Sequence, residues 1–197
     1  MALTIALTRA NLMKQNLFGA LVLMLLPLIT FAQKPGAGHP YPIDSVSGLW
    51  TYEGIVEMEG LTKADGYARA GEWVKSQIKD PAGFYTVQDA EQGKIEGKHR
   101  IPLFRTVDKQ RIRSQMLVKY TLTLWFKDGR YRYRISNLNL ERATYYPLEQ
   151  WLEPATYANA ETKDYTEQVH TFCMEFIASL NAHMAKAQKN ETNEDDW

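Results

Sequence analysis

The stretch QMLVKYTLTLWFKDGRYRYRISN, residues 115–137, decides the fold of this chain. Apolar and polar residues alternate along it, which is the pattern of β-strands with one buried face. Asp128-Gly129 interrupts the alternation and suits a two-residue type I′ turn, in which both central residues have a positive φ. Such a turn pairs residues across the two strands as follows: Lys127 with Arg130, Phe126 with Tyr131, Leu124 with Tyr133, and Leu122 with Ile135. All the apolar pairs fall on one face, so the turn and the alternation predict the same register.

Further elements are predicted on both sides of this hairpin. Alternation predicts strands over residues 50–58, 84–89 and 94–104. A helix is expected to start at Thr62, capped with Asp65, and to stop before Asp80-Pro81. A long apolar stripe predicts a second helix over residues 162–189. The order β-α-β-β-β-β-α is most economically an α+β fold, with one antiparallel sheet and both helices packed on one face.

Trp73 does not fit the apolar stripe of the first helix. At about 100° per residue it lies well away from Tyr67, Val74 and Ile78. We therefore assign it to a second packing seam, against the C-terminal helix or the loop over residues 145–151.

The N-terminal segment has the features of a secretory signal peptide. Residues 17–32 read LFGALVLMLLPLITFA and carry no charge, while Arg9 and Lys14 precede them. The run is shorter than the ~20 residues of a spanning helix, and Pro27 interrupts it. We expect residues 1–32 to be cleaved, leaving a periplasmic or extracellular protein with no stable membrane anchor. The segment from Met13 is a complete signal peptide by itself, which favours Met13 as the translation start.

Sequencing the N-terminus of protein recovered from its native envelope tests the leader. We expect the first residue to be Gln33, or its cyclised form, because Thr30 and Ala32 suit the positions before the cleavage site. Recovery of mature protein that still carries residues 1–32 would contradict this prediction.

Composition limits the remaining possibilities. The chain has 197 residues with 23 basic and 23 acidic side chains, so its formal net charge is zero. This balance is not that of a general nucleic-acid binder, and we expect no nucleic-acid partner. The single cysteine, Cys173, excludes an internal disulfide framework and a multi-thiolate metal site. We expect residues 33–48 to be a flexible Pro/Gly-rich linker, 49–189 the α+β domain, and 190–197 an acidic disordered tail.

Four phrases of the sequence resemble a known family. They are PID at 42–44, YARAGEW at 67–73, GKIEGKH at 93–99 and YTLTLWFKDGRYRYRIS at 120–136. In this order they are similar to domain-of-unknown-function family 4468, over roughly residues 40–185. The resemblance implies secreted proteins typical of Bacteroidota, with a fold like that of the TATA-box-binding protein. It brings no established activity and no catalytic residues. The TATA-box-binding protein has two such units in one chain, whereas this sequence has one. A saddle-like surface here would therefore need a homodimer.

Several side chains suggest chemistry but have simpler interpretations. His170 and Cys173 are three apart on a helix, yet Cys173 lies within the apolar stripe, and two ligands are too few for zinc. Glu53 and Glu57 fall on one strand face, where alternating surface charge accounts for them equally well. His99 lies on the core side of its strand with no visible partner triad. We therefore predict no catalytic residue, no metal site and no cofactor.

The face of the sheet away from the helices is the candidate site. Trp125 is expected opposite Arg132 on this face, and exposed Trp and Arg are enriched where proteins bind partners. The predicted binding residues are Trp125, Arg130, Arg132, Arg134, Lys119 and Lys98. The alternative for these residues is a surface in which the arginines merely cover the ring.

Two functions follow from this sequence. The first is an exported, non-enzymatic module that binds an envelope or extracellular partner through the open face. The alternative is a small-molecule-binding protein or enzyme whose pocket lies under the last helix. That pocket would be lined by Tyr120, Tyr131, Tyr133 and His99.

Overall fold

A computed structural model describes residues 40–194, with side chains as far as Lys186; the expected leader and residues 33–39 lie outside this range. The strands are β1 (Tyr52–Glu57), β2 (Tyr85–Asp89), β3 (Lys94–Val107), β4 (Gln110–Lys127) and β5 (Arg130–Leu140). The helices are α2 (Lys63–Gln77), α3 (Pro81–Phe84), the 3₁₀ helix η1 (Leu148–Leu152), α4 (Pro154–Tyr157) and α5 (Ala160–Glu194). Among these described helices, none combines the length and the apolarity needed to cross a membrane.

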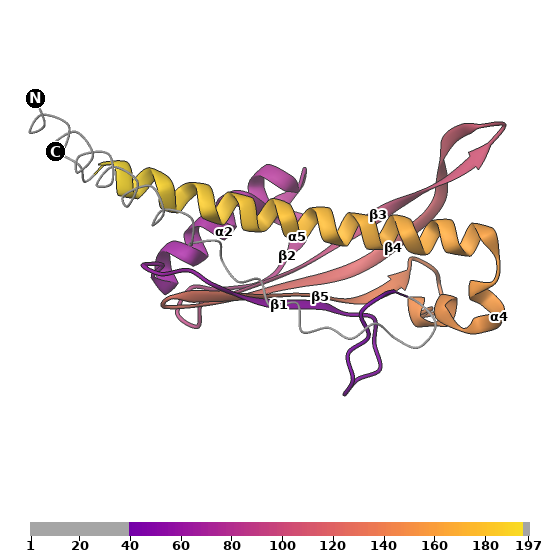
Figure 1. The fold of residues 1–197 in the computed structure, drawn as a ribbon, viewed down its shortest axis with the longest axis horizontal. Coiled ribbons are helices and arrows are strands. Elements are labelled where there is room, and N and C mark those ends of the chain that lie inside the picture. Colours follow the sequence, from indigo (N-terminus) through magenta and orange to yellow (C-terminus); the bar gives the residue numbers. More distant parts are fainter. Residues whose placement is uncertain (1–39, 195–197) are drawn as a thin grey trace, which may run out of the picture.

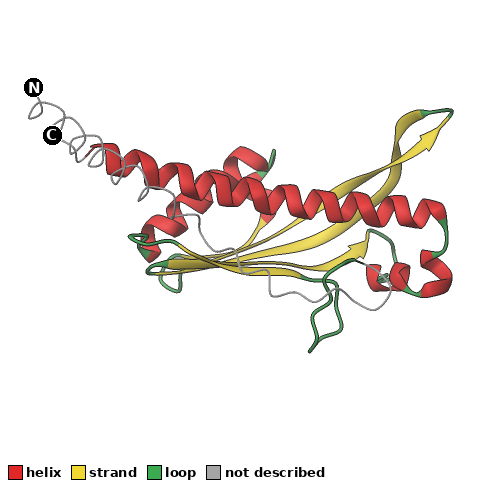
Figure 2. Ribbon diagram, in the orientation of Figure 1, coloured by secondary structure: helices red, strands yellow, loops and turns green. Residues whose placement is uncertain are grey.

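The strands form one antiparallel sheet in the order β1-β5-β4-β3-β2. Helices α2 and α5 lie on one face of this sheet, and α5 runs along its length (Figures 1 and 2). Buried side chains of the sheet, α2 and α5 make up one hydrophobic core. The predicted α+β fold is therefore confirmed.

The hairpin of β4 and β5 has the predicted register, but its turn differs. Lys127 pairs with Arg130, and the three apolar pairs follow as expected. Gly129 has a φ of 77°, whereas Asp128 does not take a positive φ, so the turn is not type I′. Tertiary contacts hold the tip: the Lys63 N–H donates to Asp128 Oδ1 at 2.8 Å, and the Gly129 N–H donates to the Leu61 carbonyl at 2.7 Å. Both hydrogen bonds come from the connection between β1 and α2. They hold a turn that differs from the type I′ turn that an Asp-Gly pair favours locally.

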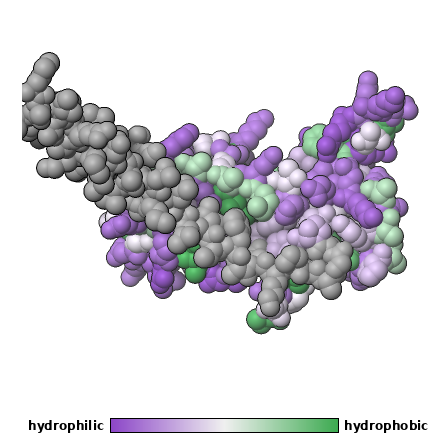
Figure 3. Space-filling view, viewed as in Figure 1, coloured by the Kyte–Doolittle hydropathy of each residue, from purple (hydrophilic) through white to green (hydrophobic). Residues whose placement is uncertain are grey.

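Strands β3 and β4 are longer than the sequence suggested. We expected a strand end at Phe104 and a new start near Gln115, but residues 105–114 continue the two strands as a protruding arm (Figure 1). Its surface is mostly hydrophilic (Figure 3). Asp108 and Lys109 form the turn with φ values of 49° and 64°, the positive pair that we had expected at residues 128–129. The prediction missed this turn because it contains no glycine.

Residues 41–48 are not the flexible linker that we expected. Tyr41 is 1% exposed, its ring stacks on Trp50 at 4.7 Å, and its hydroxyl donates to Thr166 Oγ1 on α5 at 3.1 Å. Ile43 forms a β-bridge with Trp50. The Pro/Gly-rich composition gave no sign of this packing, part of which depends on Thr166, 125 residues away. At the other end, α5 runs to Glu194 instead of ending at 189, and residues 195–197 of the expected tail lie outside the described range.

Trp73 packs where the second seam was predicted. It is 1% exposed, and its ring contacts Phe176 on α5 with centroids 4.6 Å apart. Its indole N–H donates to Ser179 Oγ at 3.1 Å. Gly66, Ala70 and Val74 are buried on the same helix. The seam therefore joins α2 to α5 as well as to the sheet.

Candidate functional site

The sheet face opposite the helices presents side chains from all five strands. Period-two alternation in the strands sends every second residue to this face, which we call the open face. One cross-strand row contains Ile55, Arg132, Trp125, Lys94 and Asp89, in the order of the strands. Trp125 is half-buried in this row, directly opposite Arg132 as the sequence indicated.

The first group of candidate residues surrounds Trp125. We call Trp125, Arg130, Arg132 and Arg134 the tryptophan–arginine cluster. The guanidinium carbons of Arg132 and Arg134 lie 5.0 and 6.0 Å from the centroid of the Trp125 ring, so both arginines lie over it.

Glutamates on β1 pair with these arginines. Glu53 accepts from both Arg132 and Arg134, the latter at 2.5 Å, and Glu57 lies 3.7 Å from Arg130. The carboxylates therefore fix the guanidinium groups over the ring and neutralise part of the cluster's charge. Three arginines against two glutamates leave a net positive cluster. The sequence did not reveal these pairs, because they depend on β1 lying beside β5.

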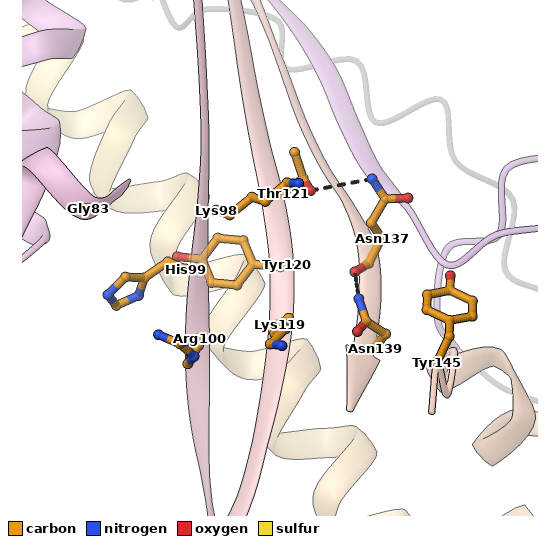
Figure 4. A pocket seen from close by; sticks show the side chains of 10 residues that line it. All are labelled: Gly83, Lys98, His99, Arg100, Lys119, Tyr120, Thr121, Asn137, Asn139 and Tyr145. Atoms are coloured by element: carbon orange, nitrogen blue, oxygen red, sulfur yellow. Dashed lines mark hydrogen bonds between the residues drawn. The ribbon is translucent and has the colours of Figure 1, made fainter. Parts of the chain in front are cut away.

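A second group lies at the other end of the open face, around a hollow of about 460 Å³ (Figure 4). We call it the basic hollow. Its charged and polar lining consists of Lys98, His99, Arg100, Lys119, Tyr120, Thr121, Asn137, Asn139 and Tyr145, with Gly83 at the edge. Lys119 is six residues from Trp125 on β4, so the two groups are about 20 Å apart at 3.3 Å per residue.

The basic hollow has more positively charged than negatively charged side chains. Arg100 and Lys119 lie directly opposite each other on β3 and β4, an unfavourable pairing of like charges. Glu141 lies between them, 2.9 Å from Arg100 Nε and 3.2 Å from Lys119 Nζ. Burial acts to raise the pKa of Glu141, but these hydrogen bonds outweigh it and hold that pKa below its ordinary value. No carboxylate of the described residues pairs with Lys98, so three bases share one acid here.

A backbone irregularity forms the floor of the basic hollow. The register between β4 and β5 shifts between Lys119 and Thr121, and Asn137 takes a left-handed φ of 55°. The Asn137 Nδ2 donates to Thr121 Oγ1 at 3.4 Å, and the Asn139 Nδ2 donates to the Asn137 carbonyl at 2.7 Å. Bulges of this kind re-aim side chains, and they are enriched beside functional sites.

His99 and Tyr120 extend the basic hollow toward the core. His99 is half-buried, and burial lowers its pKa, so the imidazole is favoured in its neutral form. Tyr120 is 1% exposed, and burial raises the pKa of its hydroxyl. That hydroxyl has no hydrogen-bond partner among the described residues. Tyr131 and Tyr133, expected with these two around a pocket under the last helix, are instead packed into the core at 1% exposure.

The surroundings of His170 and Cys173 on α5 favour a structural role for both residues. Cys173 is fully buried, and burial raises the pKa of its thiol. The Tyr52 hydroxyl and His170 Nδ1 are 2.8 Å apart, within hydrogen-bonding distance. Burial lowers the pKa of His170. The described part of the chain contains no group of three or more His, Cys, Asp or Glu side chains placed to hold a metal ion.

The six residues predicted from the sequence therefore form two groups. Trp125, Arg130, Arg132 and Arg134 come together, whereas Lys98 and Lys119 lie in the basic hollow. The sequence analysis missed the polar residues Asn137, Asn139 and Tyr145. The one signal for them was that the apolar alternation of β5 breaks after Ser136.

Comparison with known proteins gives a matching family model and a fold. Residues 52–141 match the family model described as "Domain of unknown function (DUF4468) with TBP-like fold". A crystal structure of a DUF4468 family protein from Bacteroides ovatus is 15% identical, with a TM-score of 0.59 over 72% of this chain and 89% of that one. A crystal structure of a TBP-like protein from Parabacteroides distasonis is 14% identical, with a TM-score of 0.51 over 72% and 97%.

At these identities the structural likeness shows the fold alone, and no curated protein matches the chain. The family model, the antiparallel five-stranded sheet and the structural neighbours agree with one another. The chain therefore has a TBP-like fold, and residues 52–141 match the DUF4468 family model.

Proposed function

We propose that this protein is an exported, non-enzymatic binding module that engages an anionic envelope or extracellular partner through the open face. The observation that carries the proposal is Trp125, half-buried beneath Arg132 and Arg134 on a face that no described helix covers. A fold does not determine a function, so this face, and not the family, supports the proposal.

The geometry favours binding because the cluster is already ordered. Immobilising a long side chain at an interface costs about 0.5–1.5 kcal/mol. Glu53 holds both guanidinium groups beside the ring before any partner arrives, so less of this cost falls on binding. The rival interpretation, in which the arginines only cover the ring, explains the contacts but assigns no role to the excess of positive charge.

The double change Trp125→Ser with Arg132→Ser tests the proposal. With the wild-type protein as bait, we expect capture of the envelope partner to fall at least about tenfold in the variant, since Trp and Arg carry much of the energy of such patches. Capture by the wild type should also weaken as salt rises, because the partner is anionic. Quantitative capture from envelope extract, with circular dichroism to verify folding, measures both effects.

The matched control is Lys75→Ser with Lys79→Ser, which removes two exposed charges from the region of α2. It should capture the partner as the wild type does. If the folded Trp125→Ser/Arg132→Ser protein captures every partner as well as the control, the tryptophan–arginine cluster is only a solvated surface and the proposal is wrong.

A further inference from the structure

We propose that the basic hollow is a small-molecule site for a polyhydroxy acid of the hexuronate type, a sugar ring that bears a carboxylate. The inference rests on the proposed function, because it assigns a ligand class to one end of the same open face. It is carried by charge, shape and the hydrogen-bonding groups that the protein leaves unused.

The net positive charge of the basic hollow favours an anionic ligand. Elsewhere on this face two glutamates, Glu53 and Glu57, pair with the three arginines of the tryptophan–arginine cluster, and Glu96 pairs with Lys94. In the basic hollow the like-charged pair Arg100 and Lys119 shares Glu141, and Lys98 adds a third positive charge without a carboxylate. A ligand carboxylate between Lys98 and Lys119 would neutralise part of the remaining positive charge.

The shape suits a small organic molecule and not a bare ion. The volume of about 460 Å³ lies within the range of about 300–1,000 Å³ that is typical of small-molecule sites. The register shift at Asn137 opens this space by interrupting the regular packing of side chains between β4 and β5.

The unused polar atoms distinguish a polyhydroxy acid from phosphate. Asn137 and Asn139 each spend an Nδ2 donor within the protein, whereas no hydrogen bond of the described residues uses either Oδ1. Phosphate has only one or two donor hydroxyls at neutral pH, whereas a sugar ring has several hydroxyls that can donate to such oxygens. Tyr145, 65% exposed at the rim, offers an aromatic ring against which a sugar ring can pack.

Titration calorimetry with D-glucuronate tests the assignment, using protein expressed with its own leader and purified as the cell delivers it. We expect saturable binding of glucuronate, and at least about tenfold weaker binding of D-glucose, which lacks the charge-assisted contact of the carboxylate. Inorganic phosphate should likewise bind at least about tenfold more weakly, since it has at most two donor hydroxyls at neutral pH and no ring that could pack against Tyr145.

Lys98→Gln is the informative variant, because Lys98 is exposed and its loss should leave the fold intact. We expect it to weaken glucuronate binding about tenfold. The matched control Lys127→Gln removes an exposed lysine from the far end of β4 and should leave binding unchanged. Any of three results would overturn the proposal. They are the absence of saturable glucuronate binding, phosphate binding as tight as that of glucuronate, and equal effects of the two variants on glucuronate binding.

The two proposals fail separately. Trp125→Ser with Arg132→Ser should retain glucuronate binding, because the cluster lies at the other end of the face. Loss of partner capture without loss of glucuronate binding supports both assignments. Glucuronate binding combined with undiminished partner capture by that variant would overturn the proposed function alone.

Discussion

Replacing Trp73 with alanine is expected to lower the free energy of unfolding by about 3–5 kcal/mol, the usual cost of truncating a large buried aromatic side chain. The ring is 1% exposed and contacts Phe176, and the indole N–H donates to Ser179. Removing it would leave a cavity between α2 and α5 and an unpaired Ser179 hydroxyl. Urea denaturation followed by circular dichroism measures the loss.

Two further substitutions make this prediction specific. Trp73→Phe keeps an aromatic ring but loses the hydrogen bond to Ser179, so we expect a smaller loss of about 1–3 kcal/mol. Trp125→Ala removes the same residue type from the open face and should cost about 1 kcal/mol or less, since its contacts are partly exposed cation–π interactions. If Trp73→Ala and Trp125→Ala were equally costly, the seam between α2 and α5 would not be a major source of stability.

The sheet was predictable from the sequence where local pattern and burial agree. In residues 115–137 the alternation of apolar residues fixes which face is buried, and a one-residue slip would bury Lys119 and Arg132 in the core. The register is therefore correct even though the turn type is wrong. Asp128 and Gly129 are held by residues 61–63, and no local pattern contains that information.

The segments that were predicted wrongly lack the local patterns that usually mark ordered structure. Tyr41 lies in a Pro/Gly-rich stretch that is typical of a linker, yet its hydroxyl binds Thr166 on α5. The arm over residues 105–114 lacks both the apolar alternation and the glycine that usually mark a hairpin. In each case the structure is decided by pairing that composition does not reveal.

The candidate site was predictable only in part, for a related reason. Alternation in a strand places Trp125 and Arg132 on the open face, so these positions follow from the sequence. The acids that pair with the bases do not, because Glu53 and Glu141 come from β1 and from the residue after β5. The basic hollow depends on the left-handed Asn137, and a single sequence gives no means to recognise that conformation.

Gly97→Val is expected to destabilise the protein by about 3 kcal/mol, the upper end of the usual cost of overpacking a core. Gly97 is buried on β3, and a Cβ atom at this position would lie 2.3 Å from two ring carbons of Phe84. Phe84 is itself 1% exposed at the end of α3, next to Tyr85, which pairs with Gly97. The added side chain would therefore have to displace α3 and the start of β2. Chemical denaturation measures the change.

The control is Gly71→Ala, a change of opposite expected sign. Gly71 lies inside α2, where an added Cβ meets nothing within 4 Å, so alanine should raise stability by about 0.5–1 kcal/mol through lower entropy of the unfolded chain. Gly97→Ala should fall between these variants, because its single methyl group meets the same ring as valine does. Equal stabilities of Gly97→Val and Gly71→Ala would show that Phe84 does not occupy the space over β3. The position of α3 against the edge of the sheet, and with it the Gly83 edge of the basic hollow, would then be incorrect.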